Sequence, residues 1–304
     1  MSVIDVRGLR KSYGGVEAVR DLTFHVDEGE VVAVLGPNGA GKTTTVEILE
    51  GYRRRDGGEA RVLGFDPAVG GAAYRTRIGI VLQECGFDPF LTVREVVTMY
   101  AGYYPAPRAV DEVIELVGLV EKAKSRVRAL SGGQQRRLDL ALGLIGDPDL
   151  LFLDEPTTGF DPSARRQAWE LVRRLGVLRK TVLLTTHYME EAQALADRVV
   201  VIAAGRKVAD GPPESIGGRA DAEVAIRFEL PAGTRPADLP VTVTEELGRI
   251  VVVRTPRPTA VLGELTAWAL ARGDELTGLT VTRPSLEDVY LELTDDHENG
   301  ASEP

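Results

Sequence analysis

The sequence contains the stretch Gly36-Pro37-Asn38-Gly39-Ala40-Gly41-Lys42-Thr43, which has the spacing of a loop that cradles phosphate groups. Residues 31–35, immediately before it, form an apolar run rich in β-branched side chains, as in a buried parallel strand. The residues after it predict a helix. Glycines admit the positive φ angles that let N–H groups of the loop and of the first helical turn point at one anion. The stretch therefore predicts an α/β domain with a phosphate site at this strand end.

Lys42 is expected to contribute most of the affinity of this loop. At ~3 Å from a phosphate charge, with an effective dielectric constant of ~20, its ammonium group gains roughly 5 kcal/mol. The helix dipole adds only ~0.3 to 1 kcal/mol. The hydroxyl of Thr43 is expected to be a ligand of Mg²⁺. The residues predicted to bind a nucleotide here are Gly36, Pro37, Asn38, Gly39, Ala40, Gly41, Lys42, Thr43 and Thr44.

The composition indicates a globular protein. The 304 residues leave room for one large domain and a smaller one. Hydrophobic residues make up 43% and charged residues 27%, and no apolar run approaches the ~18 residues that span a bilayer. Residues 2–7 read as a strand, not as a basic segment before an apolar signal core. We therefore expect a cytoplasmic protein that does not itself cross a membrane.

Charge and cysteine content exclude two further classes of function. The formal net charge is −10, and nonspecific binding of nucleic acid needs clustered Lys and Arg, so no nucleic-acid partner is expected. The single cysteine, Cys85, excludes an internal disulfide framework and a cysteine-rich metal site.

A second helix start with the character of an anion site lies at Leu130-Ser131-Gly132-Gly133-Gln134. Ser131 and the two glycines precede a helix, so N–H groups of the first turn are available to an anion. Apolar residues follow at helical spacing and predict that this helix buries one face. The chain thus has two separate helix starts that can face phosphate.

Polar residues end three of the strand-like apolar runs: Gln83, the pair Asp154 and Glu155, and His187. Parallel α/β sheets bind ligands at the carboxyl ends of their strands, so we expect these side chains at one site. Gln83 is placed to contact Mg²⁺ or water. Successive strand residues point in opposite directions, which gives Asp154 and Glu155 different roles. We assign Asp154 to Mg²⁺, usually through water, and Glu155 to the attacking water; a pair of solvated acids is the alternative.

Alternating residues 1–30, with a Gly14-Gly15 turn, predict an antiparallel strand pair. Tyr13 lies just before that turn, and its ring either packs ordinarily or stacks on adenine. Thr92 and Glu95 have the spacing of a capping box that opens a helix to about residue 102. Several aromatic residues between 87 and 104 form either the core of a helical subdomain or a groove for a partner.

The remaining elements follow from hydrophobic periodicity. Helices are predicted at 44–55, ended by Gly57-Gly58, and at 110–117, 121–124, 163–175, 190–196 and 259–271. Further strands are predicted at 62–63, 78–82, 150–155, 181–186, 199–202, 207–208, 224–230, 250–253 and 279–282. We place a domain boundary near residue 217. Ser285 to Asp288 cap a terminal helix that ends near residue 293, and residues 295–304 read as a disordered acidic tail.

Together these motifs resemble the complete ordered set of an ABC-transporter ATP-binding subunit. The resemblance covers residues 1 to about 215 and rests on the phosphate loop, Gln83, residues 130–134, Asp154, Glu155 and His187, together with Asp161 in the turn before the helix at 163. It makes Tyr13 the residue that stacks on adenine. Phe160 departs from the leucine usual in the aspartate loop. Residues 284–290 resemble the carboxyl-terminal region of daunorubicin-type drug-resistance exporters.

The resemblance implies a fold and a division into domains. A P-loop NTPase core of the ABC ATPase type would occupy residues 1–216, with an antiparallel β subdomain and a helical subdomain at about 85–147. A small α+β accessory domain would occupy residues 217–294, before the tail at 295–304.

The resemblance also implies a mechanism in which two chains, as a homodimer, enclose two ATP molecules with Mg²⁺. Lys42 would bind the β- and γ-phosphates, and Thr43, Gln83 and Asp154 would bind the Mg²⁺ ion. Glu155 would polarise water, and His187 would orient and stabilise the γ-phosphate. The residues expected at the nucleotide from the opposite subunit are Ser131, Gly132, Gly133 and Gln134. Asp161 is also expected to bind the nucleotide.

The implied partner is a separate polytopic membrane permease, contacted through residues 84–104 on the cytoplasmic face of the cell membrane. The resemblance favours export of a drug-like, antibiotic or lipid cargo. The alternative function is a soluble ATP-gated interaction protein that is not coupled to transport.

Overall fold

The computed structural model describes residues 2–81, 86, 88–219 and 222–290. Over these residues the chain forms two compact units, one up to Pro213 and one from Glu214. The division lies three residues before the boundary expected near residue 217. Gln83, Cys85 and the acidic tail lie outside the described residues.

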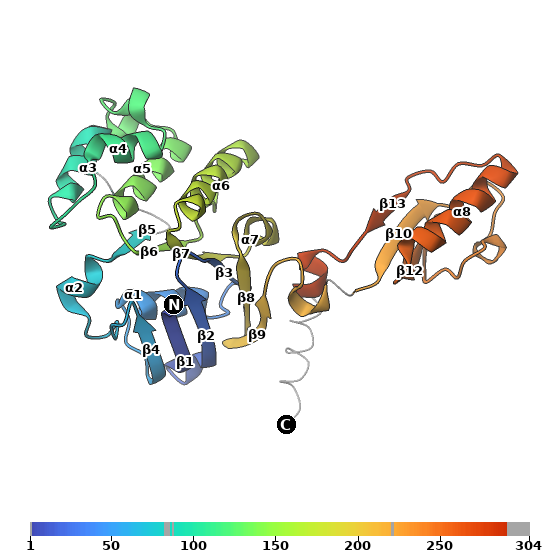
Figure 1. Ribbon diagram of the computed structural model, residues 1–304, viewed down its shortest axis with the longest axis horizontal. Helices are drawn as coiled ribbons and strands as arrows, with labels where there is room; N and C mark the ends of the chain where they lie inside the picture. Colours follow the sequence, from blue (N-terminus) through green and yellow to red (C-terminus); the bar gives the residue numbers. More distant parts are fainter. Residues whose placement is uncertain (1, 82–85, 87, 220–221, 291–304) are drawn as a thin grey trace. The chain divides into compact units, whose positions relative to one another are not determined.

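The first unit is organised around a largely parallel sheet in the strand order β5-β6-β7-β3-β8-β9 (Figure 1). Its strands are β5 (Ile78–Val81), β6 (Leu150–Asp154), β7 (Thr181–Thr186), β3 (Val31–Leu35), β8 (Arg198–Ala203) and β9 (Arg206–Gly211). Strands β5 to β8 run parallel, and β9 pairs antiparallel with β8. All of β3 and β7 is buried, as continuous apolar runs predict for strands covered on both faces.

A second sheet, in the order β2-β1-β4, packs against this one. Strands β1 (Ser2–Tyr13) and β2 (Val16–Asp27) form the predicted antiparallel pair around Gly14 and Gly15, and β4 (Gly57–Val62) joins them. Ile4 and Phe24 from this sheet share a buried core with Phe152 of β6. The sequence therefore encoded both layers through its alternating and continuous apolar patterns.

The helix after the phosphate loop is shorter than predicted. α1 (Lys42–Glu50) ends at Gly51, whose φ of 85° places it in the left-handed region and whose N–H bonds the carbonyl of Ile48. A Cβ on Gly51 would lie 2.6 Å from the carbonyl oxygen of Pro67, so close packing also requires glycine there. The predicted breaker Gly57-Gly58 instead begins β4.

Three helices lie together at one end of the first unit (Figure 1). They are α3 (Val93–Ala101), α4 (Val110–Leu116) and α5 (Gly132–Leu144). The predicted capping box of Thr92 and Glu95 is confirmed. The predicted helix at 121–124 is instead a 3₁₀ turn, Val120–Lys122, one of two short turns that connect α4 to α5.

Three further helices complete the first unit: α2 (Gly71–Arg75), α6 (Pro162–Val177) and α7 (Met189–Leu195). The sequence did not predict α2, which has five residues and no side-chain cap. Asp161 caps α6, and α7 follows directly on β7 and His187.

The second unit is an antiparallel sheet, in the order β11-β12-β10-β13, with a helix. The elements are β10 (Val224–Glu229), β11 (Glu245–Leu247), β12 (Ile250–Thr255), α8 (Pro258–Arg272) and β13 (Thr280–Thr282). Ile226, Phe228, Val251 and Val253 of the sheet pack on Leu265 of α8. Strand β11 was not predicted because all three of its residues are exposed and show no apolar alternation.

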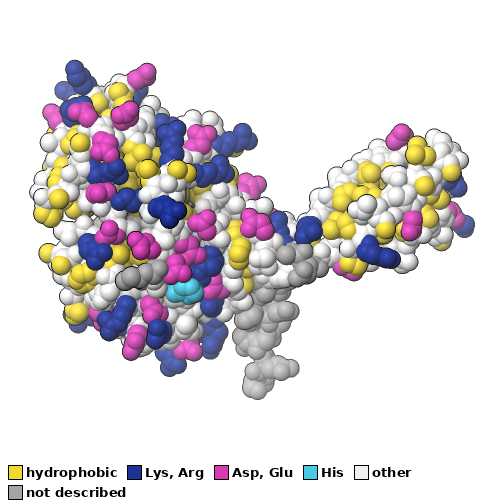
Figure 2. All heavy atoms as spheres, viewed as in Figure 1, with side chains coloured by type: hydrophobic (Ala, Val, Ile, Leu, Met, Phe, Trp, Pro, Cys, Tyr) yellow, Lys and Arg dark blue, Asp and Glu magenta, His cyan; other side chains and the backbone are white. Residues whose placement is uncertain are grey.

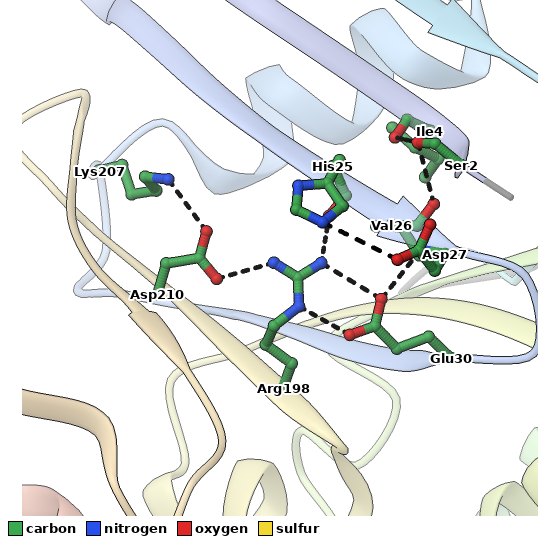
Figure 3. A network of polar contacts seen from close by, with 9 residues as sticks. All are labelled: Ser2, Ile4, His25, Val26, Asp27, Glu30, Arg198, Lys207 and Asp210. Atoms are coloured by element: carbon green, nitrogen blue, oxygen red, sulfur yellow. Dashed lines mark hydrogen bonds and ion pairs between the residues drawn. The ribbon is translucent and has the colours of Figure 1, made fainter.

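A network of charged side chains centred on Arg198 joins β8 to β2, to β9 and to Glu30, which lies just before β3 (Figure 3). The Arg198 guanidinium donates to Glu30 Oε1 at 2.7 Å and to Asp210 Oδ1 at 2.8 Å, and it also bonds the carbonyl of His25. Arg198 Nη2 donates to Glu30 Oε2 at 3.2 Å as well. One largely buried cation therefore fixes the ends of β2, β8 and β9 relative to one another.

The surface combines both signs of charge. On the face drawn in Figure 2, Lys and Arg side chains are interspersed with Asp and Glu over the first unit. Among the described residues, no helix combines the length and the apolar character needed to span a bilayer.

Substitution Arg198→Met tests the charged network. It leaves the partly buried Glu30 carboxylate without its cation and leaves Asp210 with Lys207 alone, so we expect the free energy of unfolding to fall by about 1 to 3 kcal/mol. Arg7→Met is the matched control, because the Arg7–Asp5 pair is exposed and contributes little. Urea unfolding followed by circular dichroism measures both variants. Equal effects of the two substitutions would show that the Arg198 network stabilises the fold no more than an exposed ion pair does.

Candidate functional site

The phosphate loop occupies the junction of β3 and α1, as predicted. Gly39 and Gly41 have φ angles of 82° and 100°, in the region that favours glycine. A Cβ on Gly36 would lie 2.3 Å from the carbonyl oxygen of Ile202, and one on Gly41 would lie 2.3 Å from that of Ala18. At Gly36 close packing alone excludes a side chain, and at Gly41 both the backbone conformation and the packing do.

Lys42 is buried within this loop, with 5% of its surface exposed. Its Nζ donates to the carbonyl oxygens of Gly36 at 2.7 Å and Pro37 at 3.0 Å. Burial lowers the pKa of Lys42, while the charges of Glu155 and Asp154 oppose that shift. The ammonium group, the two carboxylates and the loop therefore belong to one site. Thr43, in the next position, is exposed.

Asp154 ends β6 beside β7. Its carboxylate accepts a short hydrogen bond from the hydroxyl of Thr185, the residue paired with it across the two strands. Burial raises the pKa of Asp154 and outweighs the lowering by the Thr185 hydroxyl. The role of Thr185 was not predicted from the sequence, although a hydroxyl at the end of an apolar strand was the available signal.

Glu155 and His187 meet at the strand ends. Glu155 Oε1 lies 3.2 Å from Nδ1 of His187, and Glu155 Oε2 accepts from the hydroxyl of Thr158 at 2.9 Å. The φ of Glu155 is 44°, a left-handed conformation that is uncommon for glutamate. Its N–H donates to the carbonyl of Thr185 at 3.2 Å and to the hydroxyl at 3.0 Å, which holds this conformation. The turn directs Glu155 toward His187.

The other predicted anion site is a well-formed helix start. Ser131 Oγ accepts from the N–H of Gln134 at 3.3 Å, and Gln134 Oε1 accepts from the N–H of Ser131 at 3.1 Å. Gly132 and Gly133 form the first turn of α5. A Cβ on Gly133 would lie 3.7 Å from Cβ of Ala164, so the starts of α5 and α6 adjoin.

The predicted Asp161 side chain caps α6, accepting from the N–H groups of Ser163 at 2.8 Å and Ala164 at 2.9 Å. In the described part of the chain, no hydrogen bond joins Asp161 or the Ser131 turn to the phosphate loop.

Tyr13 lies at the end of β1 with its ring partly exposed. The Lys11 ammonium group and the Arg53 guanidinium lie 5.3 and 5.2 Å from the ring centroid. These contacts define the surroundings of the ring, and its stacking on adenine stays a prediction. Gln83 lies outside the described residues.

A cavity of about 350 Å³ lies beside the end of α1. Its lining includes Glu50, Tyr52, Tyr100 and Tyr104. Glu50 is 5% exposed, and its Oε1 has no hydrogen-bond partner among the described residues. Burial, then the charges of Asp154 and Glu47, raise the pKa of Glu50 to about 8. The sequence did not reveal this group, because helix ends commonly carry exposed glutamates.

The Glu50 pKa predicts a pH dependence of stability. Its folded-state pKa of about 8 exceeds the ordinary 4.5, so the neutral form stabilises the native state at low pH. That contribution is lost as pH rises from about 5 to about 8. We expect Glu50→Gln to reduce the loss of unfolding free energy between about pH 5 and about pH 8 by a few kcal/mol, as measured by urea titration at these two pH values.

The control for this titration is Glu28→Gln, which removes an exposed carboxylate and should keep the slope of the unsubstituted protein. A Glu50→Gln profile parallel to that of the unsubstituted protein would contradict the raised pKa.

Comparison with known proteins supports the resemblance found in the sequence. Residues 19–158 match the family described as ABC transporter, and residues 224–285 match the C-terminal domain of ABC transporter domain-containing protein-like sequences. Nod factor export ATP-binding protein I of Rhizobium johnstonii is 41% identical over 96% of this chain and 94% of its own length. Daunorubicin resistance ATP-binding protein DrrA3 of Streptomyces coeruleorubidus is 40% identical over 97% and 96%.

Solved structures show the same fold. CbiO1 of Clostridium perfringens, part of an ABC transporter complex, has a TM-score of 0.64 and 28% identity over 70% of this chain and 89% of its own. An ATP-binding subunit of an ABC transporter gives a TM-score of 0.62 with 27% identity over 70% and 90%. The predicted P-loop α/β fold is confirmed. The chain therefore belongs to the ABC-transporter family, as an ATP-hydrolysing subunit.

Proposed function

We propose that this chain hydrolyses ATP with Glu155 as the general base and thereby drives a separate membrane permease. The observation that carries the proposal is the 3.2 Å contact of Glu155 with His187, beside Lys42 and Asp154 at the ends of adjacent strands. Residues 36–44 would bind the phosphates, and Tyr13 would stack on the adenine.

The residues present fit a bound Mg²⁺. This ion prefers oxygen ligands and keeps several waters, and the Thr43 hydroxyl and the Asp154 carboxylate are oxygen donors of the required kind. Gln83 is the third proposed contact. When bound, Mg²⁺ would neutralise charge on the phosphates, and a neighbouring cation would also favour the ionised form of Asp154.

Glu155 is suited to accept a proton from the attacking water. Its carboxylate is only 15% exposed, and it is held by Thr158 on one oxygen and His187 on the other. A base held in one orientation at the reaction centre contributes by position as well as by basicity. His187 would orient the γ-phosphate and stabilise its developing charge.

Replacement of the proposed base gives the main test. Glu155→Gln should lower the rate of ATP hydrolysis by roughly 10² to 10⁴ because the amide cannot accept the proton. Binding of ATP should be retained, since the phosphate loop is unchanged. Steady-state phosphate release and binding of a fluorescent ATP analogue measure the two effects. Glu190→Gln, at an exposed position of α7, is the control. Full turnover by Glu155→Gln would exclude Glu155 as the base.

We propose that two identical chains form the working unit. The capped turn of Ser131 to Gln134 is a preformed anion site without a hydrogen bond to the phosphate loop in the described chain, and pairing with a second copy would give it a γ-phosphate to bind. Gly132, Gly133 and Asp161 would lie at the same interface. In this assignment residues 1–216 form the ATP-binding domain and 217–294 the accessory domain.

The permease would contact residues 84–104, of which Tyr100 and Tyr104 line the cavity beside α1, on the cytoplasmic face of the membrane. The cavity suits a protein partner because its lining includes the exposed Tyr52 ring and two further tyrosines. The names of the relatives favour export, and we propose a drug-like, antibiotic or lipid cargo.

Tyr52→Ala tests this contact surface. Loss of an aromatic anchor costs about 1 to 2 kcal/mol, so the affinity for membranes that contain the co-expressed permease should fall about 5- to 30-fold. Sedimentation of the purified chain with such membranes measures the affinity. Val177→Ala removes an exposed apolar side chain outside both the cavity and residues 84–104, and should leave binding unchanged. Equal binding by Tyr52→Ala and the unsubstituted chain would contradict the assignment.

A further inference from the structure

A fully buried carboxylate lies close to the Glu155–His187 contact and is not used in the proposed chemistry. Glu191 of α7 has 0% of its surface exposed. Its Oε1 accepts from the hydroxyl of Thr157 at 2.8 Å and from the indole N–H of Trp169 at 3.1 Å. Three segments of the chain therefore meet at one oxygen atom.

These segments carry the two groups that meet at the site. Thr157 follows Glu155 by two residues, and Glu191 follows His187 by four. Trp169 lies on α6, whose start is capped by Asp161 at the end of the same turn. Glu191 thus connects the turn after the proposed base, the helix after the histidine and the helix packed beside both.

Burial of a carboxylate is costly unless hydrogen bonds satisfy it, and an apolar side chain of similar volume is often equally stable in its place. Burial raises the pKa of Glu191, and the hydrogen bonds from Thr157 and Trp169 oppose the shift, as does the charge of Arg165. The bonds are directional, so they fix the positions of their donors, which apolar packing does with less precision.

We infer that Glu191 is a positioning residue for ATP hydrolysis, holding the Thr157 turn against α7 so that Glu155 and His187 meet. The inference rests on the proposed role of Glu155. A small displacement of either segment would separate the base from the histidine, while the phosphate loop on α1 would stay in place. Loss of Glu191 should therefore affect turnover more than the binding of ATP.

The informative substitution is Glu191→Leu, which keeps the volume and removes both hydrogen bonds. We expect kcat to fall about 10- to 100-fold, the effect of misplacing reacting groups by roughly 1 Å, with the KM for ATP changed less than about twofold. The midpoint of thermal unfolding should stay the same or rise. Glu191→Gln keeps an acceptor oxygen and should recover most of kcat, and Glu190→Gln is the exposed control.

A second readout comes from Trp169. Trp268, in the second unit, is the other tryptophan of the chain, so Trp268→Phe leaves Trp169 as the only tryptophan fluorophore. In that background Glu191→Leu should shift the emission maximum, because the indole N–H loses its acceptor. Thr157→Val should reproduce the loss of kcat, and the double variant should lose no more than either single variant.

Two results would overturn the inference. One is a Glu191→Leu variant with kcat within twofold of the unsubstituted chain; the other is a loss of kcat that follows a loss of thermal stability. Glu155→Gln, measured in parallel, separates this failure from that of the proposed function. Full turnover by Glu155→Gln refutes the base itself, whereas its inactivity beside a fully active Glu191→Leu refutes only the positioning role.

Discussion

The site depends on one constraint of the parallel sheet: the carboxyl ends of β3, β6 and β7 lie at the same edge. The register of these strands brings the loop of Lys42, the two carboxylates and His187 together from positions up to 151 residues apart in the sequence. Burial at this edge lowers the pKa of Lys42 and raises that of Asp154. An anionic phosphate would favour the charged form of Lys42 and a cation that of Asp154, which makes the edge suited to a metal–nucleotide complex.

Contacts beside this edge of the sheet determine where Glu155 and His187 lie. Glu155 leaves β6 in a left-handed conformation that the backbone and hydroxyl of Thr185 hold. On the next strand His187 leads into α7, and the Glu191 carboxylate joins that helix to the turn after Glu155. The chemistry of the site is thus set by a few side chains, while their positions are set by buried polar groups on neighbouring elements.

Much of this arrangement could be predicted from local sequence signals. The loop of residues 36–43 predicted a strand, a turn and a helix in that order. The signals at Thr92 and Ser131 predicted two further helix starts, and both form capping boxes. The strand-end positions of Asp154, Glu155 and His187 followed from apolar runs. Each of these signals depends on neighbours within a few residues.

Features that depend on distant contacts could not be predicted. The end of α1 at Gly51 is set partly by the approach of Pro67, and the burial of Glu50 and Glu191 comes from packing against other elements. Thr185 acquires its role from its cross-strand neighbour Asp154. Strand β11 is exposed throughout and depends on pairing with β12, so its own sequence shows no strand pattern.

In the proposed dimer, the Ser131 turn of a second copy completes the nucleotide site. The most direct measurement is the molar mass of the Glu155→Gln chain by light scattering, with and without ATP, beside the same chain carrying Ser131→Arg. We expect the mass of two chains only when ATP is present, and the mass of one chain for the Ser131→Arg variant under both conditions. A mass that does not respond to ATP, or a Ser131→Arg variant that still pairs with ATP, would contradict it.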